Sequence, residues 1–224
     1  MSNIFSSSIG RKLIMSISGL FLISFICVHL SVNLLLIFDD SGELFNLAAH
    51  FMDSNPIVKI VEPLLAIGFA VHIIYATIIT IQNKKTRPQK YSVQNNKATS
   101  SWSSRNMYIL GTLIVLFLAV HLSDYFYKIK FGIMPTITID GTIMNDAYLV
   151  VSKSFINHFW YSLLYIASGL FLGLHLTHGF WSAFQTIGWS NTLWLKKLKT
   201  IALVYAIIIA TGFSIIPLYF LIFM

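Results

Sequence analysis

Histidines inside apolar segments are the residues of this chain best suited to do chemistry. The sequence contains seven histidines, namely His29, His50, His72, His121, His158, His175 and His178. His158 stands at the start of the fourth long apolar segment, and five others fall deeper within such segments, one in each of the first three and two in the fourth. One imidazole in a membrane commonly makes a hydrogen bond between helices, whereas imidazoles on four neighbouring segments indicate ligands for heme held inside a helix bundle.

The composition is that of an integral membrane protein. Of the 224 residues, 56% are hydrophobic and only 10% are charged, with a mean hydropathy of +0.75, whereas a soluble domain has roughly 25% charged residues. A net charge of +7 would suggest nucleic acid as the partner of a soluble protein, but here it indicates basic loops on one membrane face and no nucleic-acid partner. The single cysteine, Cys27, excludes an intrachain disulfide and a cysteine-based metal site.

Five apolar segments are long enough to cross a hydrocarbon layer of roughly 30 Å. They lie at about 13–37, 57–81, 106–127, 156–181 and 201–223. A helix satisfies its own backbone hydrogen bonds in lipid, so we expect an all-α membrane protein with one domain over residues 1–224, in which the first four helices form a heme-binding bundle. The first segment follows two basic residues as a signal peptide would, but its length and its lack of a cleavage pattern indicate a retained span.

The distribution of charge predicts how the chain crosses the membrane. Of the 15 basic residues, 11 lie before the first span, between the second and third spans, or between the fourth and fifth. They are Arg11, Lys12, Lys84, Lys85, Arg87, Lys90, Lys97, Arg105, Lys196, Lys197 and Lys199. All eight acidic residues lie in or near the opposite loops. Because basic loops stay in the cytoplasm, we expect a cytoplasmic N-terminus and an outer C-terminus.

Depth along the helices sorts the membrane histidines into pairs. With a rise of about 1.5 Å per residue, His29 and His121 lie about 12 Å and 9 Å from the outer ends of their helices. On the same scale, His72 and His175 lie about 14 Å and 9 Å from the inner ends. We therefore expect an outer heme between the first pair and an inner heme between the second. His178 lies only about 5 Å from the inner end, and we expect it to make a hydrogen bond instead of binding the inner heme.

Several residues near these histidines have both a structural and a cofactor-binding interpretation. Gly169 and Gly173 are spaced for close helix packing, and they would also leave room for a flat macrocycle. Four residues near the inner face could meet heme propionates, although interfacial anchoring explains them more simply: Arg11, Ser16, Trp102 and Arg105. We expect His158, at the outer start of the fourth span, to be structural.

A histidine and two acidic residues occur where a quinol would release its protons. The segment at about 43–54 has apolar residues at helical spacing and is expected to form an amphipathic helix on the outer surface. His50 and Asp53 share this helix, and Glu62 lies near the outer end of the second span. Imidazole and carboxylate groups suit proton transfer from a quinol that is oxidised near the outer heme. On spacing alone, solvated surface residues are the simpler interpretation of this group.

The order and spacing of several motifs resemble a known family. The motifs are "SSIGRKLIMSISG", "FICVHLSVN", "GELFNLAAHFMDSNP", "FAVHIIYA", "FLAVHLSDYF" and "LHLTHGFWSAFQTIGW". Together they are similar to the single-polypeptide, di-heme cytochrome b anchor of succinate:quinone oxidoreductases, the group that contains succinate dehydrogenases and fumarate reductases. The resemblance covers most of the chain and is weakest over residues 128–154 and the last helix.

The resemblance implies two b-type hemes, each held by two histidines, with the four ligands His29, His72, His121 and His175. It implies a non-ligating role for His178. It also implies a flavoprotein subunit and an iron–sulfur subunit on the cytoplasmic face of a bacterial inner membrane. A quinone, in this subgroup usually menaquinone, would react near the outer heme, with Asp53 as the acidic residue of that site. Succinate chemistry would belong to the flavoprotein, and this chain would be the quinone-reactive, electron-transferring subunit.

Two other functions remain open on the sequence. A di-heme cytochrome b subunit of a formate dehydrogenase or hydrogenase shares the four-helix arrangement, but the first outer loop argues against it. A small transporter could use its histidines to relay protons or bind a metal ion. Such a transporter more often has broken helices and acidic residues at mid-membrane, and no acidic residue is central in this sequence.

Overall fold

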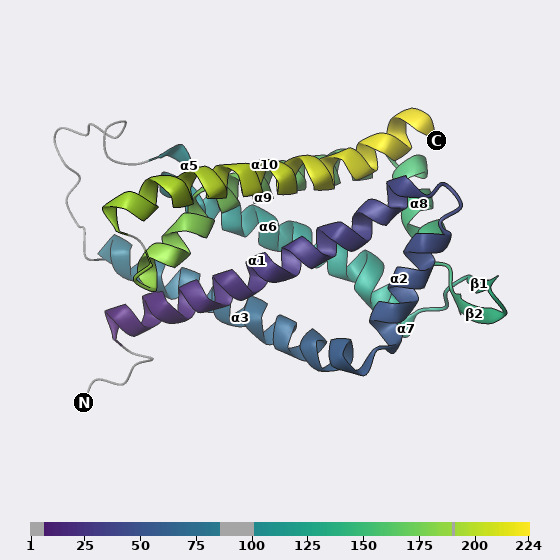
Figure 1. The fold of residues 1–224 in the computed structure, drawn as a ribbon, viewed down its shortest axis with the longest axis horizontal. Coiled ribbons are helices and arrows are strands. Elements are labelled where there is room, and N and C mark those ends of the chain that lie inside the picture. The colour runs from purple at the N-terminus through teal and green to yellow at the C-terminus, as the bar shows by residue number, and fades with distance from the viewer. Residues whose placement is uncertain (1–6, 86–100, 190) are drawn as a thin grey trace.

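Five long helices run along the molecule in the computed structural model, which describes residues 7–85, 101–189 and 191–224 (Figure 1). They are α1 (Ser8–Phe38), α3 (Pro56–Lys85), α6 (Met107–His121) with its continuations η1 (Leu122–Tyr127) and α7 (Lys128–Phe131), α9 (Phe159–Thr186) and α10 (Thr192–Phe223). Each of the five is long and apolar enough to cross a membrane. The prediction of an all-α, multi-pass membrane protein is therefore confirmed.

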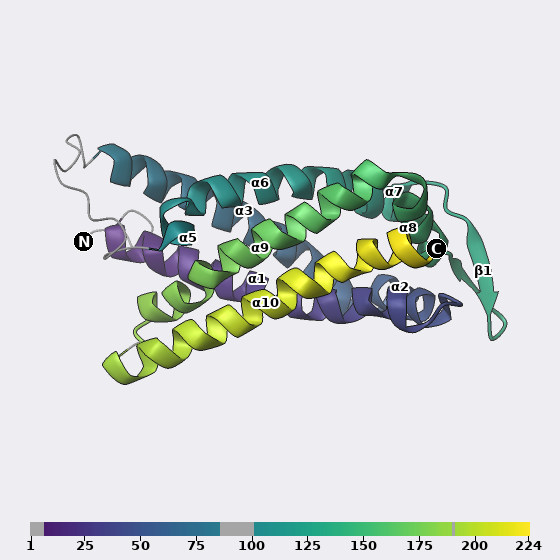
Figure 2. The same cartoon turned by 90° about the horizontal axis from the view of Figure 1, so that it is seen from above.

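The two ends of the bundle, which Figure 2 shows from above, consist of segments that differ in charge. The basic end contains the start of α1, the end of α3, the short helix α5 (Trp102–Arg105) and the turn between α9 and α10. The acidic end contains α2 (Glu43–Ser54), α8 (Ala147–Asn157), a small hairpin and the end of α10. This segregation follows the charge pattern of the sequence. Arg87, Lys90 and Lys97, which were counted with the basic loops, lie outside the described residues.

The five helices correspond to the five predicted spans, but several of them begin or end elsewhere than the predicted bounds. The third span continues beyond residue 127 to Phe131, through a π-helical turn that begins directly after His121. The predicted start of the fourth span, residue 156, lies within α8, and α9 begins only after a break at His158. The fifth helix begins at Thr192 instead of residue 201, because the Asn191 side chain caps its first turn and carries the helix into the basic segment.

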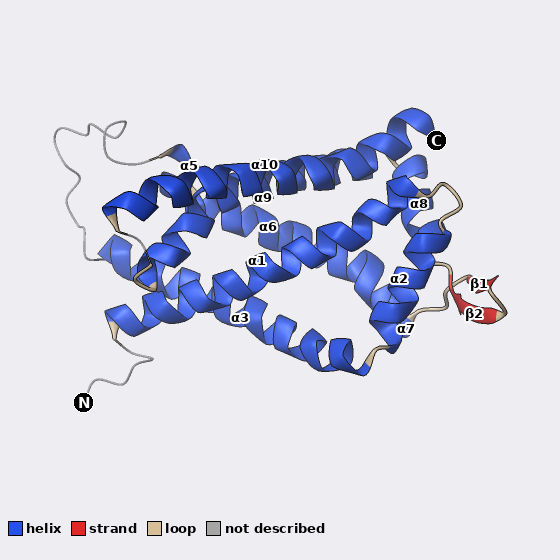
Figure 3. Ribbon diagram, viewed as in Figure 1, coloured by secondary structure: helices blue, strands red, loops and turns tan. Residues whose placement is uncertain are grey.

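A short β-hairpin, which was not predicted, projects from the acidic end (Figure 3). Strands β1 (Thr136–Ile139) and β2 (Thr142–Asn145) pair antiparallel, with Ile139 opposite Thr142. Asp140 and Gly141 form the two-residue turn with positive φ angles of 48° and 75°, as a type I′ turn requires. The Asp-Gly pair between residues of high β-propensity was the available signal, in the segment 128–154 where no element was predicted.

Buried hydrogen bonds hold α2 against α8 at the acidic end. The Asn46 side chain, which is 1% exposed, donates through Nδ2 to Oδ1 of Asp146 over 3.0 Å. Its Oδ1 accepts from the backbone N–H of Tyr148 over 2.8 Å. Both hydrogen-bonding ends of this buried amide are therefore satisfied by the segment that begins α8, which fixes the orientation of α2.

The chain enters α2 through a tight turn. Gly42 has a φ of +74°, and the ring of Tyr148 occupies the space that a Cβ at this position would need, so glycine is required. Asp39 accepts hydrogen bonds from the backbone N–H groups of Leu44 and Ser41. These bonds, of which the one from Leu44 contributes most, hold the pKa of Asp39 below its ordinary value. The predicted amphipathic helix at about 43–54 is confirmed as α2, with its start capped by Asp39.

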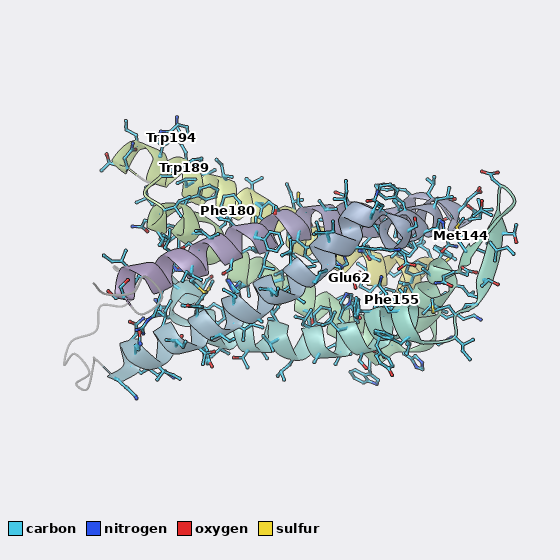
Figure 4. The ribbon with its side chains drawn as sticks, turned by 90° about the horizontal axis from the view of Figure 1, so that it is seen from below. Glu62, Met144, Phe155, Phe180, Trp189 and Trp194 are labelled. Carbon is cyan, nitrogen blue, oxygen red and sulfur yellow. The ribbon has the colours of Figure 1, made fainter. Side chains whose placement is uncertain are left out.

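The buried residues concentrate at the acidic end and along α10. The larger cluster consists of Leu36, Phe45, Tyr125, Ala147, Val151, Phe155, Ile216 and Phe220. A smaller cluster of Leu30, Leu176, Ala206 and Ile209 joins α1, α9 and α10. In contrast, α3 has no buried residue. Figure 4 shows Trp189 and Trp194 at the basic end, where tryptophan suits a membrane boundary, and Met144 at the opposite end.

The glycine pair singled out in the sequence packs against α10. A Cβ at Gly173 would lie 2.6 Å from the Cβ of Ala210, and a Cβ at Gly169 would lie 2.9 Å from the Oγ of Ser214. Close helix packing therefore accounts for both glycines. Residues of α10 fill the space beside both glycines. The structure therefore gives no support to the alternative that these two glycines make room for a macrocycle.

We predict that Gly173→Ala destabilises the protein by about 1–3 kcal/mol, because the added methyl group overpacks the contact with Ala210. Thermal unfolding in detergent would measure the effect. In the double variant Gly173→Ala/Ala210→Gly, the loss should be smaller than the sum of the two single losses, because the second change restores the space. Strict additivity would show that these two positions are not in contact.

Candidate functional site

The four histidines predicted to bind heme form two pairs. His29 of α1 lies beside His121 at the end of α6, with ring centroids 5.8 Å apart and ring planes inclined by 86°. His72 of α3 lies beside His175 of α9, with centroids 6.4 Å apart and planes inclined by 64°. Each histidine comes from a different long helix. These are the two pairs that depth along the helices predicts.

The pairs join helices across the bundle. Direct packing connects α1 with α3 and α9, and connects α6 with α9. The histidine pairs instead connect α1 with α6 and α3 with α9, which are not among the closely packed helix pairs of the described residues. The imidazoles therefore meet between diagonally opposite helices, the position in which a bundle holds a cofactor.

The separation of the rings fits one metal ion between two imidazoles. A bond from a metal ion to an imidazole nitrogen is about 2 Å long, and the ring centre lies about 1 Å beyond that nitrogen, which places two coordinating rings about 6 Å apart. A hydrogen bond of about 3 Å between ring nitrogens would bring the centroids to about 5 Å. The observed values of 5.8 and 6.4 Å leave room for the first arrangement and exceed the second, although packed rings beside these histidines lie at similar distances. No hydrogen bond joins the paired rings within the described chain.

Aromatic rings surround the pair nearer the acidic end. Phe25 stacks on His29 with centroids 5.2 Å apart, and Phe213 lies 5.8 Å from the same imidazole. Phe117 stacks on His121 at 5.6 Å. These flat, apolar side chains exclude water and provide surfaces suited to a flat aromatic macrocycle.

Glycines of neighbouring helices border the pair nearer the basic end. A Cβ at Gly19 of α1 would lie 3.4 Å from Cε1 of His72, and a Cβ at Gly111 of α6 would lie 3.5 Å from Cε1 of His175. Both imidazoles thus pack on glycine backbone, with little room for a larger residue. Neither glycine was predicted, because each faces its histidine from another helix and no local spacing reveals this contact.

His178 lies near the pair of His72 and His175 without joining it. Its ring contacts Trp181, with centroids 4.9 Å apart, and the described residues include no ring contact between His178 and His72. The Nδ1 atoms of His175 and His178 are both buried without a hydrogen-bond partner, so this property does not separate the two residues. The ring of His175 lies beside that of His72, which favours His175 as the ligand. This assignment stays a prediction.

A lysine that was not predicted brings two of the candidate proton-transfer residues together. Lys130 Nζ lies 2.8 Å from Oδ1 of Asp53 on α2 and 3.1 Å from Oε2 of Glu62 on α3. Lys130 itself belongs to α7, which the extension of the third span through η1 carries to this position. Figure 4 shows Glu62 on the half of α3 nearer the acidic end. We call Asp53, Glu62 and Lys130 the carboxylate–lysine cluster.

His50 does not share in this cluster. It lies on α2 one helical turn before Asp53 and is half-buried, and the described residues give it no ion pair with either carboxylate. The residues described by the structure also contain no group of three or more histidine, cysteine, aspartate or glutamate side chains arranged to hold a metal ion. A heme iron takes only two side-chain ligands, so pairs of histidines fall outside that kind of group.

Comparisons of the chain with models of protein families, with curated proteins and with solved structures gave no match.

The carboxylate–lysine cluster predicts specific zero-length cross-links. Carbodiimide treatment of the protein in membranes or detergent should join Lys130 to Asp53 and to Glu62, because each carboxylate oxygen lies within 3.1 Å of the amine. Peptide mass spectrometry would identify the products.

Lys130→Arg keeps the charge but removes the reactive amine, so both cross-links should disappear. The Lys128–Asp124 link, predicted from a separation of 3.2 Å, should persist as the internal control. Formation of the control link without either Lys130 link in the unchanged protein would contradict the geometry.

Proposed function

We propose that this chain is the membrane anchor and electron-transfer subunit of a succinate:quinone oxidoreductase and that it holds two b-type hemes. The observation that carries the proposal is the pairing of four histidines from four helices, with ring separations of 5.8 and 6.4 Å. The resemblance of the sequence motifs to the anchors of succinate:quinone oxidoreductases is the reason for proposing this class of enzyme. The chain would be the quinone-reactive part of the enzyme and would not oxidise succinate by itself.

Each histidine pair would hold the iron of one heme. His29 and His121 would bind the outer heme, and His72 and His175 the inner heme. When bound, a heme accepts and gives up one electron at a time at a potential set by its ligands and surroundings. The protein contributes the position of each imidazole and an apolar aromatic or glycine-lined wall beside it.

The charge distribution supports a cytoplasmic basic end and an outer acidic end in a bacterial inner membrane. In this orientation the inner histidine pair is the nearer pair to the iron–sulfur and flavoprotein subunits, which would bind the cytoplasmic face. Electrons would pass between the iron–sulfur subunit and a membrane quinone, which is menaquinone in most relatives of this type.

The carboxylate–lysine cluster is the candidate for proton transfer at the quinone site. Asp53 and Glu62 are partly exposed at the acidic end, so protons taken from a quinol have a short path to the outer medium. Lys130 compensates the negative charge of the two neighbouring carboxylates. His50 stays a weaker candidate, because it shares the helix with Asp53 but makes no ion pair with the cluster among the described residues.

Reduced-minus-oxidised spectra of the purified complex test the proposal. We expect low-spin b-type heme at two per chain. His175→Ala should remove one heme, since it takes away one side of the inner pair, whereas His178→Ala should leave both. Absence of heme from the unchanged complex would refute the proposed function, and loss of heme only in the His178 variant would reassign the inner ligand.

Quinone turnover tests the role of Asp53. Asp53→Asn should lower quinol-dependent turnover by about 10²-fold, because an amide cannot accept the proton, while both hemes stay bound. The control is Asp140→Asn in the hairpin turn, where asparagine tolerates the positive φ and no effect on turnover is expected. Turnover equal to that of the control would remove Asp53 from the quinone site.

A further inference from the structure

Two tyrosines form a hydrogen-bonded chain that ends on one of the paired histidines. The hydroxyl of Tyr165 lies 3.2 Å from Nδ1 of His121, and the hydroxyl of Tyr161 lies 2.9 Å from that of Tyr165. Both tyrosines belong to α9, one helical turn apart, and face the end of α6. His121 thus has a hydrogen-bond partner that none of the sequence motifs indicated.

The chemistry of imidazole gives this contact a direction. A neutral imidazole carries one N–H, so a ring that binds a metal ion through Nε2 has its proton on Nδ1 and donates from there. The hydroxyl oxygen of Tyr165 would accept this hydrogen bond, and the hydroxyl group of Tyr165 would donate a second hydrogen bond to the hydroxyl oxygen of Tyr161. An acceptor on the second nitrogen fixes the orientation of the ring and strengthens the first nitrogen as a ligand.

We propose that Tyr165, supported by Tyr161, is a positioning residue that orients His121 and lowers the reduction potential of the outer heme. This inference rests on the proposed function, because it takes His121 as an axial ligand. A stronger imidazole donor stabilises oxidised iron more than reduced iron, which makes the heme harder to reduce. The tyrosine pair therefore sets the potential at the step nearest the quinone.

The other three paired histidines have weaker partners. Nδ1 of His72 lies 3.5 Å from the hydroxyl of Ser18, and Nδ1 of His29 lies 3.4 Å from the amide nitrogen of Asn33. Nδ1 of His175 is buried with no partner. Of the four rings, only His121 has a side-chain contact within 3.2 Å at this nitrogen, so the effect should be confined to the outer heme.

The surrounding structure holds the two tyrosines in place. The ring of Tyr165 packs edge-on against Phe117 at 4.8 Å and against Phe155 at 5.1 Å. The fully buried Ser162, between the two tyrosines in sequence, donates from Oγ to the carbonyl of Phe155 over 3.0 Å and ties α9 to the end of α8. These contacts remain when a tyrosine is replaced by phenylalanine, so the hydroxyl can be tested without removing the ring.

Redox titration of the purified complex, followed by heme absorbance, tests the proposal. Tyr165→Phe should shift the potential of one heme upward and leave the other unchanged, and the shifted heme should be the one that is lost in His121→Ala. Tyr161→Phe should shift the same heme in the same direction by a smaller amount, because it removes only the second hydroxyl of the chain.

Tyr127→Phe is the control. Tyr127 lies on η1 near His121 in sequence, but its ring is exposed and packs against Phe131, so both potentials should stay at their original values. Unchanged potentials in Tyr165→Phe, or an equal shift in Tyr127→Phe, would overturn the proposal while the two hemes remain. If Tyr165→Phe fails to assemble, an unchanged outer potential in Tyr161→Phe would overturn it. Absence of heme from the unchanged protein would instead refute the proposed function and this inference together.

Discussion

The structure depends on the need to satisfy imidazole nitrogens in an apolar bundle. A polar ring in lipid is tolerated where it faces the bundle interior and finds a partner there. Here the paired rings face each other across the bundle without a hydrogen bond between them among the described residues, because α1 meets α6 through one histidine pair and α3 meets α9 through the other. Direct packing leaves these same helix pairs largely apart. A group held between the rings would therefore link the helices that side-chain packing alone does not join.

The acidic end contains the larger buried cluster of the bundle. Its aromatic core joins α2, α8, α9 and α10 to the end of the third span, and Asn46 ties α2 to α8 through two hydrogen bonds. The π-helical turn after His121 belongs to this region and carries Tyr125 into the core. Such turns are frequent at functional sites, because they redirect side chains without ending a helix. In this chain the turn also sets where Lys130 lies relative to α2 and α3.

The sequence predicted the features that depend on composition and regular rise. Hydropathy located all five helices, and counting residues along them paired His29 with His121 and His72 with His175. Contacts between distant segments could not be predicted in this way. Lys130 meets Asp53 from 77 residues away, and Tyr165 meets His121 from 44 residues away. The π-helical turn lies inside the predicted third span, which ends at residue 127 because Lys128 and Lys130 interrupt the apolar segment, whereas the helix continues to Phe131.

The two histidine pairs differ in what holds them. The pair of His29 and His121 has stacked phenylalanines, a tyrosine partner and the core of the acidic end beside it. The pair of His72 and His175 is bordered by glycines, and one of its helices, α3, has no buried residue. Fewer aromatic and hydrogen-bond contacts therefore hold the second pair. Under the proposed function, a bound heme would contribute more to the order of its rings than to that of the first pair.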